Sequence, residues 1–249
     1  MKGRLLLAVL ICLGLVCSNA SAAIDDYSPL LTSPNENVIL TWNVIETPDV
    51  PFSLFWAGQG FWLAEAGSEM SFELLELLDD DVEGILTVGN LTVTANNSEI
   101  AQDFALGVWG LTQWMPGLVV KVGDDNRNNL NATAYAAAAR LSGNYLNGTM
   151  NSRYEVLTVG DSAYDCIVFD YVQDPPLFGE AQQTHLAYEI ETGVLVLCNT
   201  SYSFGTPYSL VLEVSSLPSA SPDLLLLLQI AISVTGVVIV VTIIVLRRR

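Results

Sequence analysis

Apolar and polar residues alternate in short runs between residues 38 and 95, which is the pattern of β-strands with one buried face. Gly, Pro, Asp and Asn separate the runs and predict turns between them. We expect six strands, at 38–46, 52–56, 60–64, 70–78, 82–88 and 91–95. Because short connections favour pairing between neighbours in sequence, this half is predicted to form a β meander.

Two later segments space their apolar residues as helices do. The first follows a cap at Asn97 or Ser98, and its apolar residues recur at intervals of four: Ile100, Phe104 and Val108. The second covers 133–141, which contains four consecutive alanines and stops before a Ser-Gly pair. Strands and helices together predict a mainly β (α+β) domain with one or two short helices.

The segments 182–191 and 194–202 are predicted to pair as a hairpin, and the length of its turn decides which residues face the core. A three-residue loop with Gly193 in the left-handed bulge position separates apolar from polar positions. Apolar residues then face one another across the strands: Ile190 with Val194, Tyr188 with Val196 and Leu186 with Cys198. The other set is expected to point outwards: His185, Ala187, Glu189 and Asn199.

The two ends of the chain predict export and membrane anchoring. Lys2 and Arg4 precede an apolar run that closes in small residues, so 1–22 is predicted to be a secretory signal peptide. Residues 224–246 carry no charge and, as a helix, would reach roughly 34 Å, enough to cross a hydrocarbon core of about 30 Å. Arginines 247–249 would remain cytoplasmic, which predicts a type I single-pass membrane protein with its N-terminal domain extracellular.

An outer domain is expected at 23–214, and a Ser/Pro-rich stalk at 215–223 would connect it to the membrane. The charge of this domain limits the partners that it can bind. The 249 residues are 51% hydrophobic and 14% charged, which excludes a disordered acidic chain and a coiled coil. The whole chain has a formal charge of -18, but all 27 acids and only four of the nine bases lie between 23 and 223. The outer part therefore disfavours nucleic acid and anionic lipid, and favours a cation or a basic protein, unless the charge serves solubility alone.

Two cysteines and five sequons are the candidate modification sites. Cys12 and Cys17 would leave with the signal peptide, whereas Cys166 and Cys198 would remain in an oxidising exterior that favours a disulfide. A simple meander opposes this bond, because two strand spacings of about 4.8 Å exceed the limit of about 7 Å between Cα atoms. Both alternatives stay open. The candidate glycosylation sites are Asn90, Asn96, Asn131, Asn147 and Asn199.

The search for chemistry finds no catalytic signature. His185 is the only histidine, neither G-x-S-x-G nor H-E-x-x-H occurs, and the cysteines lack zinc-ligand spacing. The acidic stretches 79–81 and 124–129 lack the EF-hand pattern, so both are interpreted as solvated loops. Trp109 and Trp114 suit core packing better than a sugar-stacking platform. We therefore expect no enzyme, cofactor or metal.

One hairpin motif carries a weak family resemblance. The segment 185–195, HLAYEIETGVL, resembles the Thr-Gly hairpin of uncharacterised archaeal single-pass cell-surface proteins and, more distantly, of half-barrel lipoprotein carriers of the LolA type. The resemblance implies a curved antiparallel sheet around one or two helices, with an apolar cavity. Cys17 has no lipobox around it, so a C-terminal anchor would replace the lipid of those carriers. Leu217-Pro218-Ser219 begins like a sortase signal but lacks its remaining motif, which favours a permanent anchor.

These observations predict a glycosylated surface protein that acts in binding, adhesion or the cell-surface coat. A carrier or sensor of an apolar ligand is the first alternative, and an apolar internal pocket larger than about 300 Å³ would favour it. A carboxylate-dependent hydrolase is the second, and two carboxylates about 5 to 10 Å apart in a cleft would favour that.

Overall fold

The computed structural model describes the folded part of the chain between residues 26 and 218. The described residues are 26–32, 38–49, 51–58, 60–62, 65–109, 113–139, 147–176, 179–203 and 207–218. Among them, no helix has the length and apolar character that crossing a bilayer requires. The signal peptide, the membrane helix at 224–246 and the terminal arginines that the sequence predicts lie outside these residues.

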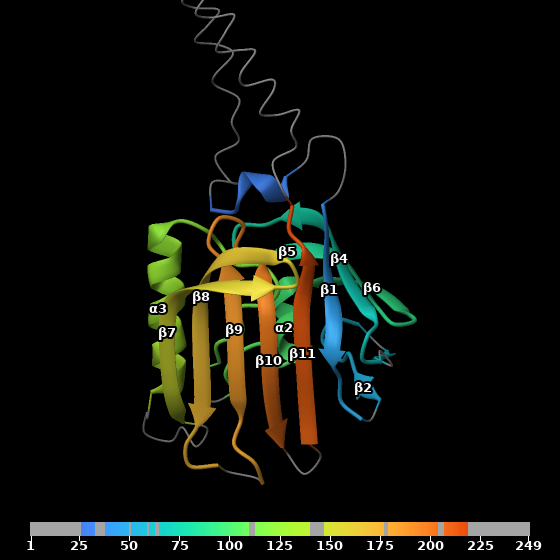
Figure 1. The fold of residues 1–249 in the computed structure, drawn as a ribbon. Helices are drawn as coiled ribbons and strands as arrows, with labels where there is room; N and C mark the ends of the chain where they lie inside the picture. Colours follow the sequence, from blue (N-terminus) through green and yellow to red (C-terminus); the bar gives the residue numbers. More distant parts are fainter. Residues whose placement is uncertain are drawn as a thin grey trace, which may run out of the picture.

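A single curved antiparallel sheet of nine strands forms the frame of the domain (Figure 1). In sheet order its strands are β6 (Leu91–Asn96), β5 (Val82–Val88), β4 (Glu69–Leu77), β1 (Ile39–Glu46), β11 (Pro207–Ser216), β10 (Leu195–Ser203), β9 (Gln183–Glu189), β8 (Ser162–Gln173) and β7 (Gly148–Val159). Neighbours in the sheet are also neighbours in sequence, except at β1, which pairs with β4 on one side and β11 on the other. Two meanders are thus joined at β1 and β11, and the mainly β prediction is confirmed.

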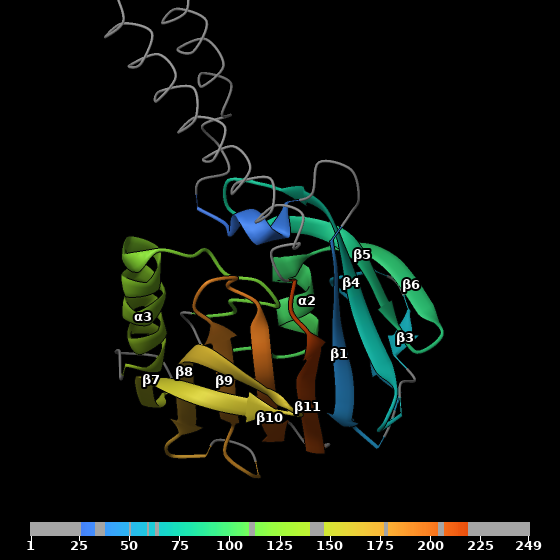
Figure 2. The ribbon, with the colours of Figure 1, turned by 45° about the horizontal axis from the view of Figure 1, so that its top comes forward.

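Two helices lie on one side of this sheet (Figures 1 and 2). Helix α2 (Asn97–Asp103) lies within the curve beside β5 and β6, and α3 (Asp124–Ala138) flanks β7 and β8. A short helix η1 (Pro29–Leu31) and a two-stranded hairpin of β2 (Phe52–Ser53) and β3 (Phe61–Trp62) complete the described elements. The presence of α2 and α3 confirms the prediction of one or two short helices.

The side of the sheet that faces the helices is filled by one hydrophobic core. Alternate residues of each strand point into it, and its largest fully buried side chains include Trp42, Phe72, Phe104, Phe169 and Tyr188. Two of the buried aromatics hydrogen-bond through their polar ends: Trp42 Nε1 donates to the Leu195 carbonyl at 2.7 Å, and the Tyr188 hydroxyl to the Gly117 carbonyl at 2.8 Å. These side chains pack the two helices and the sheet together into one domain.

Helix boundaries differ from the prediction at both helices. The stretch 124–129, expected as a loop, forms the first turns of α3, whose N-terminus favours the acids Asp124 and Asp125 there. Helix α2 ends at Asp103 because Ala105 adopts a left-handed backbone with φ 53°, so the apolar repeat continues without helical structure. Phe104 and Val108 are nevertheless buried, as their spacing indicated.

The segments expected as strands at 52–56 and 60–64 are not part of the main sheet. Within them only the two-residue strands β2 and β3 pair with each other. This hairpin packs instead against β6, where Gly58 and Gly60 lie close to the side chains of Val93 and Leu91. A Cβ at Gly58 would lie 3.2 Å from Val93 and one at Gly60 would lie 2.9 Å from the end of Leu91, so these side chains of β6 would have to shift to admit it.

The predicted register of the β9–β10 hairpin is correct away from the turn and wrong next to it. Leu186 pairs with Cys198, and His185 with Asn199, as expected. A bulge then shifts Tyr188 opposite Leu195 rather than Val196. Ala187 and Glu189 lie on the outer face, as expected, but they are buried there. The reason is the long β7–β8 hairpin, whose end bends across the outer face of the sheet (Figures 1 and 2).

Candidate functional site

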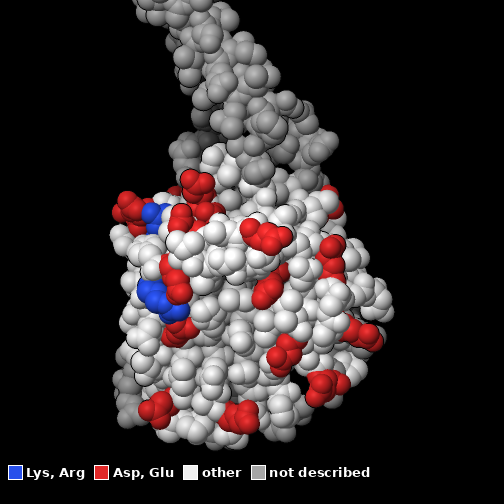
Figure 3. Space-filling model, in the orientation of Figure 1, with Lys and Arg blue, Asp and Glu red and all other residues white. Residues whose placement is uncertain are grey.

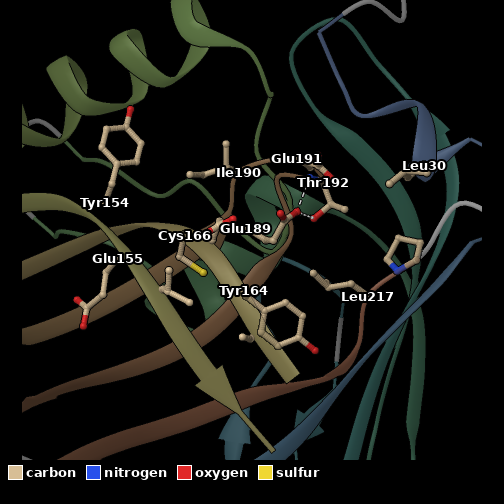
Figure 4. A pocket seen from close by; sticks show the side chains of 14 residues that line it. Leu30, Tyr154, Glu155, Tyr164, Cys166, Glu189, Ile190, Glu191, Thr192 and Leu217 are labelled. Atoms are coloured by element: carbon tan, nitrogen blue, oxygen red, sulfur yellow. Dashed lines mark hydrogen bonds between the residues drawn. The ribbon is translucent and has the colours of Figure 1, made fainter. Parts of the chain in front are cut away.

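A pocket of about 810 Å³ lies where the bent end of the β7–β8 hairpin meets the outer face of the sheet. We call it the acidic pocket. Its walls come from β7, β8, the β9–β10 turn, η1 and the end of β11 (Figure 4). The residues on which its chemistry depends are Tyr154, Glu155, Tyr164, Asp165, Glu189 and Glu191.

The pocket exists because β7 and β8 extend beyond the strand that supports them. Each has twelve residues, but β8 pairs with β9 only from Cys166 onwards. The first residues of β8 therefore have β7 as their only partner strand, and Gly160, with φ 58°, turns the hairpin. The Ile190 N–H donates to the Asp165 carbonyl at 2.9 Å and joins this overhang to the β9–β10 turn.

Glu189 forms the buried floor of the pocket. Its side chain is 9% exposed, and one carboxylate oxygen accepts from the Thr192 N–H at 2.6 Å and from the Thr192 hydroxyl at 2.7 Å. Figure 4 shows these bonds at the centre, with Tyr154 at one side and Leu30 and Leu217 at the other. Glu189 thus holds the turn in place and keeps a negative charge beneath the cavity.

Acidic side chains predominate in the wall of the pocket, and one of them, Glu155, is paired with Arg153 beside it. Burial, together with the nearby charges of Glu189, Asp165 and Glu155, raises the pKa of the Cys166 thiol to about 12. No Lys, Arg or His is among the described residues that line the cavity. Such a site favours a cation and repels an anion.

Apolar and aromatic side chains complete the walls. Leu30, Ile190 and Leu217 approach from three different elements, and Tyr154 and Val156 on β7 remain more than half exposed. Tyrosine rings attract cations over their faces, while the aliphatic residues accept an apolar body. The arrangement therefore suits a ligand that combines a positive charge with apolar surface.

A charged network lies on the same outer face, next to the pocket. His185 Nδ1 lies 2.6 Å from Asp170 Oδ1, and Arg153 bonds both to Asp170 and, at 2.7 Å, to Glu155. Burial raises the pKa of Asp170, but the hydrogen bonds from His185 and Arg153 outweigh it, so the net pKa is lowered. The network fixes the orientation of the Glu155 side chain at the pocket wall.

Of the two alternatives that the sequence left open, the structure has the one without a disulfide. Cys166 and Cys198 are both free and buried. Strand β9 lies between their strands, and the pairing places Cys166 on the outer face opposite Glu189 and Cys198 on the inner face opposite Leu186. Two strand spacings and opposite faces keep the sulfur atoms apart, as the meander argument required.

The five sequon asparagines lie at separate places and differ in exposure. Asn90 and Asn199 are exposed, Asn96 precedes α2, and Asn131 accepts a hydrogen bond from Ser152. Asn147 is only 9% exposed, which makes it the least accessible of the five in the folded domain. None of the five contributes to the acidic pocket.

The remaining candidates, Trp114 and the acidic stretch 79–81, lie in the core and in a turn of the described residues. Trp114 is buried with its ring 4.9 Å from that of Phe169, which confirms core packing. Asp79 and Asp80 are exposed in the turn between β4 and β5. No cluster of three or more His, Cys, Asp or Glu side chains placed to hold a metal occurs in the described part of the chain.

Comparison with known proteins returns no match, whether to family models, curated proteins or solved structures. Sequence patterns did not single out the residues of the acidic pocket, whose irregularity on β7 is visible only in the structure. Tyr154, Glu155 and Val156 are consecutive on β7, and all three are exposed, which breaks the alternation of a strand with one buried face.

Proposed function

We propose that this chain is a type I single-pass surface protein whose outer domain binds a cationic ligand with an apolar body in the acidic pocket. The observation that carries the proposal is the wall of the pocket, in which carboxylates and tyrosines surround a cavity without a basic residue. The ligand class includes alkylammonium and guanidinium groups, such as those presented by a basic partner.

The location of the pocket supports a role close to a membrane. Leu217 and Pro218 line it, and five residues separate Pro218 from the predicted anchor at Leu224. Five extended residues reach about 17 Å. If 224–246 spans the bilayer, the pocket therefore opens just above its surface, within reach of ligands that approach along the membrane.

The topology of the proposal has a direct test. Protease added to intact cells should digest the outer domain and leave a short membrane-bound fragment, because the bulk of the chain would face outwards. Resistance of the whole chain until cell lysis, or its release by alkaline carbonate, would contradict an outward-facing anchored protein.

Ligand chemistry can be tested with three small probes that share one phenyl body. Phenethylammonium, phenethyl alcohol and 3-phenylpropanoate carry a positive, a neutral and a negative group. Calorimetric titration of the full chain in zwitterionic nanodiscs should give at least tenfold tighter binding for the ammonium than for the alcohol, a difference of about 1.4 kcal/mol, and no binding of the carboxylate.

Variants then locate the binding. Glu189→Gln and Glu191→Gln remove charge from the pocket with little change of shape and should each weaken phenethylammonium binding at least threefold. Glu83→Gln on β5, in the other half of the sheet, serves as the matched control and should leave binding unchanged. Equal affinity for ammonium and alcohol, or equal binding by all variants, would refute the proposed ligand class.

A further inference from the structure

The β2–β3 hairpin presents three large aromatic side chains to solvent. Phe55, Trp56 and Phe61 are 73%, 50% and 64% exposed, and we call them the aromatic tip. Phe61 pairs opposite Ser53, whereas Phe55 and Trp56 lie in the turn that follows β2. The rings of Phe55 and Trp56 are 5.2 Å apart at right angles. A contiguous exposed aromatic group of this kind marks an interaction site.

A buried carboxylate holds the aromatic tip in one conformation. Asp103 at the end of α2 is 5% exposed and accepts the backbone N–H groups of three consecutive residues: Phe55 at 3.1 Å, Trp56 at 3.0 Å and Ala57 at 2.7 Å. The opposite face of the hairpin is buried, and the Trp62 ring lies 5.1 Å from that of Phe104. The exposed rings are therefore preorganised, which lowers the entropy lost on binding.

The surroundings of the aromatic tip are exclusively acidic. No Lys, Arg or His occurs between residues 5 and 120, whereas exposed acids flank the hairpin at Glu46, Asp49 and Glu65. Figure 3 shows the basic residues of its face at the left, over β7 and α3, and none at the lower right, where β1 and β2 lie. A second copy of the chain or an anionic lipid surface would bring like charge against this rim.

The aromatic tip and the acidic pocket are at opposite ends of the sheet. Strands β1 and β11 are antiparallel, with Thr41 opposite Ser216 at one end and Glu46 opposite Val211 towards the other. The hairpin follows Glu46, whereas the pocket adjoins the residues after Ser216. One ligand in the pocket therefore does not cover the tip.

We infer that the aromatic tip is a docking site for a second protein, whose surface offers an apolar depression surrounded by Lys and Arg side chains. Aromatic side chains offer about 150 to 250 Å² each, and 50 to 73% of each of these three is exposed, so docking would bury about a third to a half of the roughly 800 Å² that one side of a standard interface covers. Aromatic anchors inside a charged rim are the usual composition of an interface hot spot. This site is separate from the ligand site proposed above.

Photocrosslinking in intact cells tests the docking site with the full chain. Benzoylphenylalanine at position 55 should give one protein adduct, and the crosslinked peptide should carry Lys or Arg. The same group at Ile39, which is 60% exposed at the other end of β1, should not give this adduct. An adduct with a second copy, with lipid alone or with an acidic peptide, the same adduct from position 39, or no adduct, would overturn the inference.

Variants separate aromatic anchoring from general charge attraction. The double variant Trp56→Ser/Phe61→Ser keeps the charge and should lower the adduct yield at least tenfold, while Ile39→Ser should change it less than twofold. Asp49→Lys/Glu65→Lys should also lower the yield, because it opposes a basic rim. A yield that Trp56→Ser/Phe61→Ser leaves unchanged would refute anchoring by the tip.

The pocket variants Glu189→Gln and Glu191→Gln should not alter the crosslink. The proposal of a docking site and the proposal of a ligand site can thus be refuted independently of each other. Near-ultraviolet circular dichroism of each variant verifies that the fold is retained.

Discussion

Asp103 shows how one buried side chain can determine the conformation of a neighbouring hairpin. It is the carboxylate that accepts the N–H groups of residues 55–57, which no strand partner satisfies. Burial raises the pKa of Asp103, and the hydrogen bonds from Ala57, Trp56 and Phe55 offset this only in part. Asp103 therefore stabilises the hairpin through the hydrogen bonds that it accepts rather than through its charge.

Replacement of Asp103 by Ala should destabilise the domain by about 3 kcal/mol, because it leaves buried N–H groups without an acceptor. Urea unfolding, followed by tryptophan fluorescence, measures the loss. Glu180→Ala, at an exposed loop position, should change the free energy of unfolding by less than about 0.5 kcal/mol. Equal stability of the two variants would show that the hairpin does not depend on Asp103.

Asp170 should make the domain sensitive to acid. Its pKa is lowered in the fold from an ordinary 3.8, so its stabilising contribution is present above that pH and is lost as the pH falls through the folded value. Asp170→Asn should be less stable than the natural chain at neutral pH, and the difference should shrink below about pH 4. Urea midpoints measured across this range test the sign, and a difference that grows on acidification would contradict it.

At the scale of elements, the sequence predicted what depends on apolar spacing and missed what depends on long-range packing. The strands 70–78, 82–88 and 91–95 are close to β4, β5 and β6, because each alternates cleanly. The start of α3 was missed because Asp and Asn at 124–129 have turn propensity, while the helix dipole and packing on β7 favour the helix.

The candidate site could be predicted only in part. The excess of acid was visible in the sequence and indicated a cationic partner, but the pocket depends on the bend of β7 and β8, for which local patterns carry no information. The burial of Glu189 likewise follows from the overhanging hairpin rather than from its own strand. The aromatic tip was visible only as short apolar segments that were interpreted as strands.

Gly123 should be essential for the start of α3. It precedes the helix with φ 92° and ψ 157°, a conformation that is largely restricted to glycine, and no atom lies within 4 Å of the place where a Cβ would be. Gly123→Ala should therefore destabilise the domain by about 1 to 3 kcal/mol through backbone strain alone. Ala136→Ser, exposed on the same helix, should cost less than about 1 kcal/mol, and urea unfolding compares the two.

At the scale of the whole molecule, basic residues are distributed unequally between the two halves of the sheet. The half of the sheet formed by β1, β4, β5 and β6 has no basic residue, and the three bases of the other half that the structure describes each pair with an acid. Acids therefore outnumber bases among the described residues of both halves, which suits recognition of basic ligands at both ends of the sheet.

Exposure should decide which sequons carry glycans on the mature chain. We predict that Asn90 and Asn199 are occupied in the native host and that Asn147 is not, because only the first two project freely from the fold. Asn90→Gln and Asn199→Gln should each increase electrophoretic mobility, whereas Asn147→Gln should not. A glycopeptide that contains Asn147 would show that this residue is reached before the domain closes.

The pairing of β1 with β11 has a consequence for export. Strand β1 emerges early, but its partner is about 170 residues away, directly before the stalk. If the chain is threaded through the translocon from its N-terminus, the two meanders stay unjoined until β11 has passed through. Until then, the negative charge of the first half would make nascent copies repel one another. This repulsion would hinder pairing between their unpaired strand edges.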